Sequence, residues 1–332
     1  MSSPFEFAAR RSNSFARSRA ALLVLVVICT MVGTVSAEKL PFAASKIVPP
    51  TPQWLESVEQ NAPAQATVSA AKRKVLVFSL RTGFDHKVMP HVDRTFEILG
   101  KKTGAYDTTV TVDIEALTPE RLAGYDVLVL NNNCSKGARR NLFLDELESN
   151  PKYQGMTDEA RQAKSDQLEQ SMLEFVAGGR GLVVIHGAPV LLNNSEAFTG
   201  MVGARFDYHP PNQEVTVRPV DEAHPLVAAF IGKGPLIHRD EPYCFNGPYD
   251  ELDFRPLLSM DIEGMNDPRN KVGEIVRYVS WIKPHGKGRV FYCSPSHFPE
   301  SYESPTLLRF LLDGVQYAAG DLECDDSTPD RK

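Results

Sequence analysis

The sequence predicts an open α/β fold, in which a mostly parallel sheet carries helices on both faces. Short apolar runs rich in Val, Ile and Leu alternate with longer amphipathic stretches, as strands and their covering helices do. The clearest example is residues 175–188, where a helix ends on Gly178 and Gly179 and a β-branched run leads directly to His186. We see no internal repeat. The pattern therefore favours one large α/β domain.

The elements follow one another from residue 73 to residue 320. Thr118 and Pro119 stand where an N-cap and a first helical residue are expected, and Thr157 is placed to cap the longest helix. Gly320 follows the last helix as its stop. We predict strands at 74–80, 106–113, 125–130, 181–186, 214–220, 255–260, 275–280 and 288–293, helices at 89–100, 157–176, 196–202 and 304–319, and a short helix that residues 118–120 open.

In two segments the sequence pattern indicates no regular helix or strand. Residues 134–153 indicate an irregular insertion. Residues 38–72 hold five prolines among Ala, Ser and Gln, which favours a linker or an arm wrapped on the domain, poorly ordered in part. With a C-terminal tail at 321–332, we predict four parts in the chain: 1–37, 38–72, 73–320 and 321–332.

The N-terminus has the features of a secretory signal peptide. Four arginines precede the apolar run 20–29, and Val35-Ser36-Ala37 offers small residues of the A-x-A type. We predict cleavage after Ala37 and export to the periplasm or the extracellular space. The alternative is an uncleaved anchor, for which the run is short, since a membrane span needs ~20 residues.

The chain is acidic. Its net charge of −6 at pH 7 becomes −9 when residues 1–37, with four Arg and one Glu, are removed. An acidic surface does not attract nucleic acid or an anionic membrane, so we expect neither as a partner of the mature chain. Four cysteines remain after cleavage, without C-x-x-C spacing, and the sequence does not pair them. The sequence also leaves the oligomeric state open.

Three histidines follow predicted strands. His86 comes after the first strand, His186 after the fourth and His297 after the last. Loops after parallel strands gather at one edge of the sheet, where ligands bind in open α/β folds, so we expect these side chains around a common cleft. His209 lies beyond a short helix and is expected to close that cleft with Glu241. Imidazoles serve as acid–base groups and metal ligands, although each His alone could be a structural residue.

The position of His186 is unusual. It stands at a strand-to-helix corner with small residues, Gly187 and Ala188, behind it. Hydrolases and amidotransferases use this corner for a nucleophilic Ser or Cys. Cys134 and Cys293 also lie at strand ends, but neither is at the sharp turn, so we do not expect thiol catalysis.

Asp240 and Glu241 form the acidic partner of the histidines. Two carboxylates beside Pro242 can orient an imidazole, bind a metal or bind sugar hydroxyls, and a solvated loop is the alternative. Aromatic faces for a sugar ring could come from Phe84, Tyr208, Tyr243 and Trp281, although aromatic side chains are more often core residues. No G-x-S-x-G, H-E-x-x-H, P-loop or GxGxxG motif is present.

Several motifs, taken in order, resemble the ThuA-like family, which is named for trehalose utilisation and is similar in fold to class I glutamine amidotransferases. The matching pieces are Gly83-Phe84-Asp85-His86, residues 181–188, residues 202–210, His224-Pro225, Asp240-Glu241-Pro242-Tyr243, residues 288–292, His297 and Glu300-Ser301-Tyr302. The resemblance implies a flavodoxin-like sheet and a role around disaccharide or oxidised-sugar metabolism. His186 stands near the position of the amidotransferases' catalytic Cys, so glutamine hydrolysis is not implied.

The chain also departs from the family pattern. Residues 189–192 are Pro-Val-Leu-Leu where members often carry a polar Asp or Thr, and Ser296 replaces the usual Gly before the late His. These differences indicate that the substrate pocket of this chain has its own shape.

The leading hypothesis is an exported enzyme that acts on a disaccharide or keto-sugar by His and carboxylate acid–base chemistry. We assign catalysis to His186, His86 and Glu241, and substrate binding to His209, His297, Asp240, Tyr243 and Phe84. A divalent transition metal such as zinc could assist, held by His86, His186 and His297. The alternatives are a non-catalytic carbohydrate-binding protein and a scaffold partner in an envelope complex.

Overall fold

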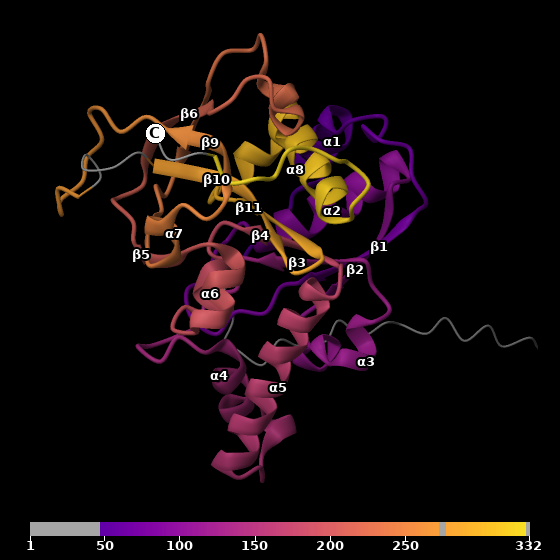
Figure 1. The fold of residues 1–332 in the computed structure, drawn as a ribbon, viewed down its shortest axis with the longest axis vertical. Coiled ribbons are helices and arrows are strands. Elements are labelled where there is room, and N and C mark those ends of the chain that lie inside the picture. The colour runs from indigo at the N-terminus through magenta and orange to yellow at the C-terminus, as the bar shows by residue number, and fades with distance from the viewer. Residues whose placement is uncertain (1–46, 272–276, 330–332) are drawn as a thin grey trace, which may run out of the picture. The chain divides into compact units, whose positions relative to one another are not determined.

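The computed structural model describes residues 47–271 and 277–329 (Figure 1). The predicted signal peptide, its cleavage point and residues 38–46 of the predicted linker lie outside these ranges. No helix within the described ranges is long and apolar enough to cross a membrane.

The centre of the fold is a nine-stranded mixed sheet whose core is parallel. Strands β2, β1, β3, β4 and β11 lie side by side and pair in parallel. Strands β10, β9, β6 and β7 extend the sheet, and each pairs antiparallel with its neighbour. In sheet order the strands are β2 (Tyr106–Thr111), β1 (Arg73–Phe78), β3 (Val127–Asn131), β4 (Gly181–Ile185), β11 (Gly288–Cys293), β10 (Arg277–His285), β9 (Arg255–Met260), β6 (Gln213–Pro219) and β7 (Leu236–Asp240).

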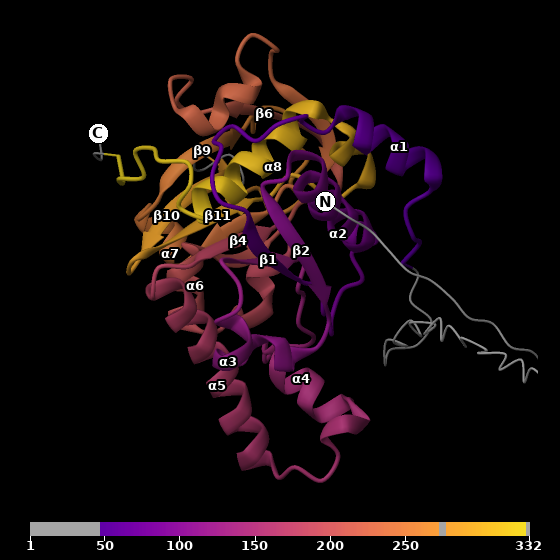
Figure 2. The same ribbon diagram turned by 90° about the vertical axis from the view of Figure 1, so that its right-hand side faces the viewer.

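Helices cover both faces of this sheet, as the sequence predicts (Figure 2). Successive residues of a strand point to opposite faces, so Val75 and Val77 pack with the helices of one layer while Leu76 and Phe78 pack with those of the other. The first layer holds α1 (Pro52–Asn61), α2 (Met89–Thr103) and α8 (Pro305–Ala318). The second layer holds α3 (Pro119–Leu122), α4 (Leu142–Ser149), α5 (Asp158–Ala177), α6 (Glu196–Val202) and α7 (Pro248–Glu251).

Local capping follows the sequence in most places. The Thr157 side chain accepts a hydrogen bond from the Ala160 backbone N–H at the start of α5, and Ser304 caps α8 in the same way. Thr118 stands at the N-cap of α3, but its side chain makes no capping hydrogen bond. The predicted strand 275–280 falls partly outside the described residues, and β10 runs on to His285.

The proline-rich segment contains a helix. Pro52 occupies the first turn of α1, where its missing N–H costs nothing, and Thr51 caps the helix. Trp54 is buried against His91 of α2, with ring centroids 4.7 Å apart, and its indole N–H donates to the Pro299 carbonyl at 3.0 Å. Of the two alternatives for this segment, residues 52–61 therefore form an arm packed on the domain.

The sequence misses other elements as well. The predicted irregular insertion contains α4, which Asn141 caps through the Leu144 N–H. Strand β7 was not predicted, and neither were β5 (Arg205–Tyr208) and β8 (Cys244–Asn246), which pair as a separate two-stranded ribbon. Strands β5 and β7 carry charged residues and β8 has only three residues, so all three lack the apolar run that identifies a buried strand.

Candidate functional site

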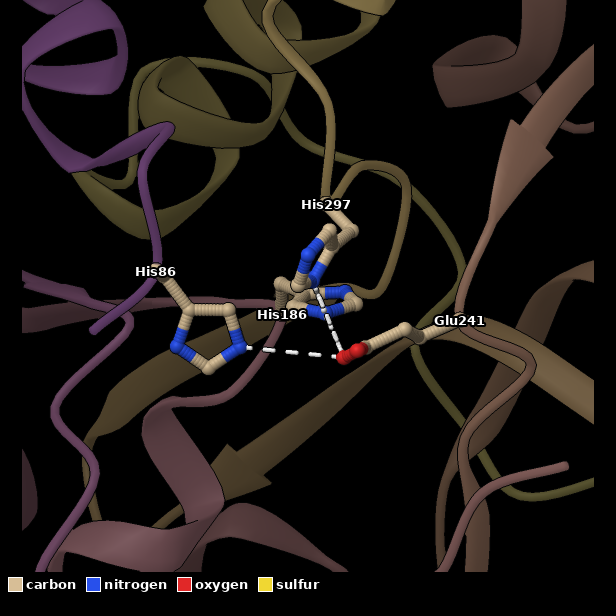
Figure 3. A group of neighbouring side chains, drawn as sticks. All are labelled: His86, His186, Glu241 and His297. Carbon is tan, nitrogen blue, oxygen red and sulfur yellow. Dashed lines mark hydrogen bonds and ion pairs between the residues drawn. The ribbon is translucent and has the colours of Figure 1, made fainter. Parts of the chain in front are cut away.

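The structure brings the three predicted histidines and Glu241 together at the carboxyl edge of the sheet (Figure 3). His86 lies between β1 and α2, His186 directly follows β4, and His297 follows β11. Glu241 directly follows β7, which points the same way as β11 because four antiparallel steps separate the two strands. One ligand atom from each of the four residues lies within 4.8 Å of the others. The expected convergence of the histidines is confirmed.

The cluster is centred on one carboxylate oxygen. Glu241 Oε2 lies 2.9 Å from His297 Nδ1, 3.4 Å from His186 Nε2 and 3.8 Å from His86 Nε2. His297 Nδ1 and His186 Nε2 are themselves 3.4 Å apart. The four side chains are nearly enclosed, and that of His297 is the most exposed at 11%. The four side chains thus form a buried cluster.

The backbone at His186 aims its ring into the cluster. The residue has a φ of 45°, in the left-handed region that non-glycine residues rarely adopt, and its N–H donates to the Cys293 carbonyl at 2.9 Å. The Tyr292 hydroxyl donates to the carbonyl of His186 at 3.1 Å. A Cβ on Gly187 would lie 2.7 Å from His86 Cε1, so only glycine allows His86 to approach this corner.

One hydrogen bond determines which ring nitrogen of His186 carries the proton and which is free to accept. Its Nδ1 lies 2.7 Å from the Ser294 carbonyl oxygen, which can only accept, so Nδ1 carries the proton. The lone pair of the neutral ring is then on Nε2, which faces Glu241 Oε2 at 3.4 Å. Two acceptors in this arrangement need a cation between them or a second proton on the ring.

The donor set fits a divalent transition metal. A tetrahedral zinc ion with bonds of ~2.0–2.2 Å separates its ligand atoms by roughly 3.3–3.6 Å. Four of the six separations between the ligand atoms, from 2.9 to 3.8 Å, span that value, and one ligand atom of each residue lies within 4.8 Å of the others. Three imidazoles and one carboxylate are also a common ligand set for such metals. His86, His186, His297 and Glu241 are therefore the residues that could hold a metal.

Burial and the contacts within the cluster shift the pKa values of His86, His186 and Glu241 in different directions. Burial lowers the pKa of His86 to about 3, although Glu241 acts in the opposite direction. Burial would raise the pKa of Glu241, but hydrogen bonds from the three imidazoles outweigh it and hold that pKa below its usual range. Burial also acts to lower the pKa of His186, yet Glu241 and Asp240 outweigh it and raise that pKa. At neutral pH the cluster thus holds a charged carboxylate and a neutral His86.

The thiols near the site are not activated. Cys134 Sγ lies 3.7 Å from His86 Nδ1 and donates to the Gly187 carbonyl at 3.5 Å. Burial raises the pKa of the Cys134 thiol to about 12 and also raises that of Cys293. Nucleophilic chemistry needs the thiolate, so neither group is prepared for it.

The residues expected to bind substrate occupy different positions. Phe84 is 57% exposed, and its ring lies 4.8 Å from that of His86. His209 stacks on Tyr243 with ring centroids 5.6 Å apart, and its Nε2 is 3.9 Å from Glu241 Oε1. Tyr243 is buried, with its hydroxyl 3.4 Å from His86 Nε2. Phe84 and His209 are therefore the members of this set that a ligand can reach directly.

Asp240 and two of the aromatic candidates face the interior. Asp240 is buried, and its Oδ1 accepts hydrogen bonds from the backbone N–H groups of Glu241 and His297, both at 2.9 Å. Trp281 lies in the core and donates to the Val202 carbonyl at 2.8 Å. Tyr208 is also buried. Of the two alternatives for these aromatic residues, Trp281 is a core residue, and Tyr208 is buried with the Arg269 guanidinium 4.3 Å from its ring centroid.

Sequence reasoning missed two contributors to the site. His238 donates from Nε2 to Asp240 Oδ2 at 3.0 Å, and the Asn132 side chain accepts from the Gly187 N–H at 3.4 Å. The signal for His238 was its spacing, since it precedes Asp240 by two residues on β7 and so shares a face of the strand with it. Asn132 follows β3 at the edge where the histidines gather.

Comparison with known proteins agrees with this architecture. A putative ThuA-like protein from Bacteroides uniformis superposes with a TM-score of 0.53 at 17% identity, over 75% of this chain and 93% of the other. One from Parabacteroides merdae superposes with a TM-score of 0.53 at 16% identity, over 78% and 94%. At these identities the likeness shows the fold. No curated protein matches the sequence.

The family model for ThuA, described as trehalose utilisation, matches residues 74–318. The match covers the sheet except for Arg73, every helix of the two layers except α1, and all four residues of the His/Glu cluster. It supports a role in trehalose utilisation at a broad level. On this match, the chain belongs to the ThuA family.

Proposed function

We propose that this protein is an exported enzyme that acts on a disaccharide or keto-sugar by acid–base chemistry at a metal-assisted His/Glu site. The observation that carries the proposal is the convergence of four ligand atoms within 4.8 Å at the carboxyl edge of the sheet, beside the exposed ring of Phe84. Buried imidazoles and carboxylates that perturb one another are typical of functional sites in open α/β folds.

His86, His186, His297 and Glu241 would hold the metal. When bound, a metal such as zinc would polarise a substrate carbonyl and favour negative charge on its oxygen, for which it would have to accept that oxygen as a fifth ligand. Glu241 would bind through Oε2, the oxygen that faces the three imidazoles, which leaves Oε1 facing His209 Nε2 at 3.9 Å. His209 is partly exposed, so its ring can hydrogen-bond to a ligand that lies next to this carboxylate.

The outer residues suit a sugar. An exposed aromatic ring such as Phe84 can stack against the C–H face of a pyranose, while His209 can donate hydrogen bonds to its hydroxyls or accept them. Enolisation or hydration next to a keto group needs a base to move a proton and no nucleophilic side chain. This chemistry matches a site that has imidazoles and a carboxylate but no activated thiol.

An assay on trehalose and on 3-keto-glycosides, before and after chelation, tests this proposal. We expect turnover of a keto-glycoside or the disaccharide, lost on chelation and restored by zinc. Sugar binding without turnover would favour the carbohydrate-binding alternative. Neither binding nor turnover, in protein that retains its fold, would overturn the assignment to sugar chemistry.

Export is the second part of the proposal and has its own test. The arginines before the apolar run 20–29 and the small residues that end at Ala37 support cleavage by signal peptidase. N-terminal sequencing of the protein from its native host should show a chain that begins near Glu38. Mature protein that keeps residues 1–30 would reject cleavage and favour the anchored form.

A further inference from the structure

Asp240 connects two members of the His/Glu cluster through their backbones. Its Oδ1 accepts the N–H group of Glu241, the next residue, and that of His297, which lies 57 residues further along the chain than Asp240. The same oxygen is 4.0 Å from His186 Nδ1. The orientation of this one carboxyl group therefore affects the backbone positions of Glu241 and His297. These positions in turn determine where the ligand atoms of the two side chains lie.

His238 fixes the other oxygen of Asp240. Its Nε2 lies 3.0 Å from Asp240 Oδ2, and since a carboxylate can only accept, His238 donates. The His238 side chain is 7% exposed. Both residues are on β7 and point to the same face of the strand, so the bond needs no loop to form it.

The second ring nitrogen of His238, Nδ1, adds no hydrogen bond that would stabilise the fold. This nitrogen is buried and has no hydrogen-bond partner among the described residues. A buried polar atom without a partner is unfavourable, and an apolar side chain at this position would avoid that cost. The bond from Nε2 to Asp240 is thus the feature that distinguishes histidine from an apolar residue here.

From this arrangement we propose that His238 is a positioning residue for the site: through Asp240 it holds Glu241 and His297 in the geometry that binds the metal. The proposal rests on the proposed function for its metal readout. His238 itself lies outside the set of four residues whose ligand atoms converge. It acts only through the Asp240 carboxylate.

Three substitutions separate this role from simple packing. In His238→Gln, the side-chain amide nitrogen occupies roughly the place of Nε2 and can still donate to Asp240. In His238→Asn, the amide nitrogen occupies roughly the place of Nδ1, and the shorter side chain does not bring it within reach of Asp240. His238→Leu fills the space without any donor. Ile237→Gln, at the neighbouring exposed position, is the control for changes to β7.

Two measurements are made on each full-length variant. The first is zinc affinity by competition with a chromophoric chelator. The second is amide hydrogen exchange at Glu241 and His297 in metal-free protein, which reports directly on their N–H bonds to Asp240. We expect the Asn and Leu variants to bind zinc ~10–100-fold more weakly and to lose protection at both amides, and the Gln variant and the control to resemble the wild type.

The outcomes distinguish this inference from the proposed function. Unchanged amide protection in both the Asn and Leu variants would overturn the positioning role, whatever the zinc affinity. An equal loss of amide protection in the Gln and Leu variants would also overturn the positioning role, because a change in packing would then explain the effect. If the wild type binds no zinc while amide protection follows the expected series, the positioning role stands and the metal-assisted function fails. If the Leu variant does not fold, the Asn and Gln pair carries the comparison.

Discussion

Replacing His186 with glutamine is expected to abolish turnover, with a loss of about 10²–10⁴-fold, and to weaken metal binding. The His186 ring is fixed by its bond from Nδ1 to the Ser294 carbonyl, so Nε2 alone faces Glu241. Glutamine has a similar size and can form a hydrogen bond, but it cannot shuttle a proton near neutral pH and is a poor metal ligand. Steady-state kinetics and zinc titration of the purified variant measure both effects.

The matched controls for His186→Gln are Cys134→Ser and Cys293→Ser. Both thiols are buried with raised pKa values, so no thiolate is lost, and activity should stay within a few-fold of the wild type. If His186→Gln keeps full activity while Cys134→Ser loses it, the imidazole interpretation fails. The contact between Cys134 and His86 would then have to be treated as a nucleophile–base pair.

Replacing Glu241 with glutamine is expected to weaken zinc binding by at least ~100-fold, because loss of a partner outside the ligand set already costs ~10–100-fold. The change is nearly isosteric, so it removes the charge and leaves the space filled. Glu241 Oε2 is the atom around which the three imidazoles gather, and it is the anionic member of the converging set. Without it, a divalent cation in a buried site would keep its full charge, which is costly in a low-dielectric environment.

Glu300→Gln is the control for Glu241→Gln, since it removes the same charge at an exposed position close in sequence to His297. Its zinc affinity should equal that of the wild type. Equal affinity of the Glu241→Gln variant and the wild type would show that the carboxylate is not a ligand. A matched drop in both variants would instead show that general surface charge controls binding.

The arrangement of the histidines could be predicted because it depends on a simple rule of parallel sheets. His86, His186 and His297 each follow an apolar run that forms a parallel strand, so their convergence at one edge follows from the topology. His186 was also recognisable by the small residues behind it, and Gly187 does contact His86 closely. The family resemblance extended this reasoning to Glu241 and is matched by the family model.

The rest of the site depends on features that have no local sequence signal. Strand β7 carries Arg, His and Asp in a five-residue run, so nothing marked it as a strand or placed Glu241 at its carboxyl end. The inward orientation of Asp240 arises from its bonds to the Glu241 and His297 backbones, which tertiary packing creates. The helix α1 was missed because its prolines suggested disorder, whereas the burial of Trp54 holds it in place.

The most direct test of the central claim is anomalous diffraction at the zinc absorption edge, from crystals of the protein saturated with zinc. We predict one strong peak bonded to Nε2 of His86, Nε2 of His186, Nδ1 of His297 and Oε2 of Glu241, at distances of ~2.0–2.2 Å. The absence of a peak among these four atoms at saturating zinc, or full occupancy at another site alone, would contradict the account.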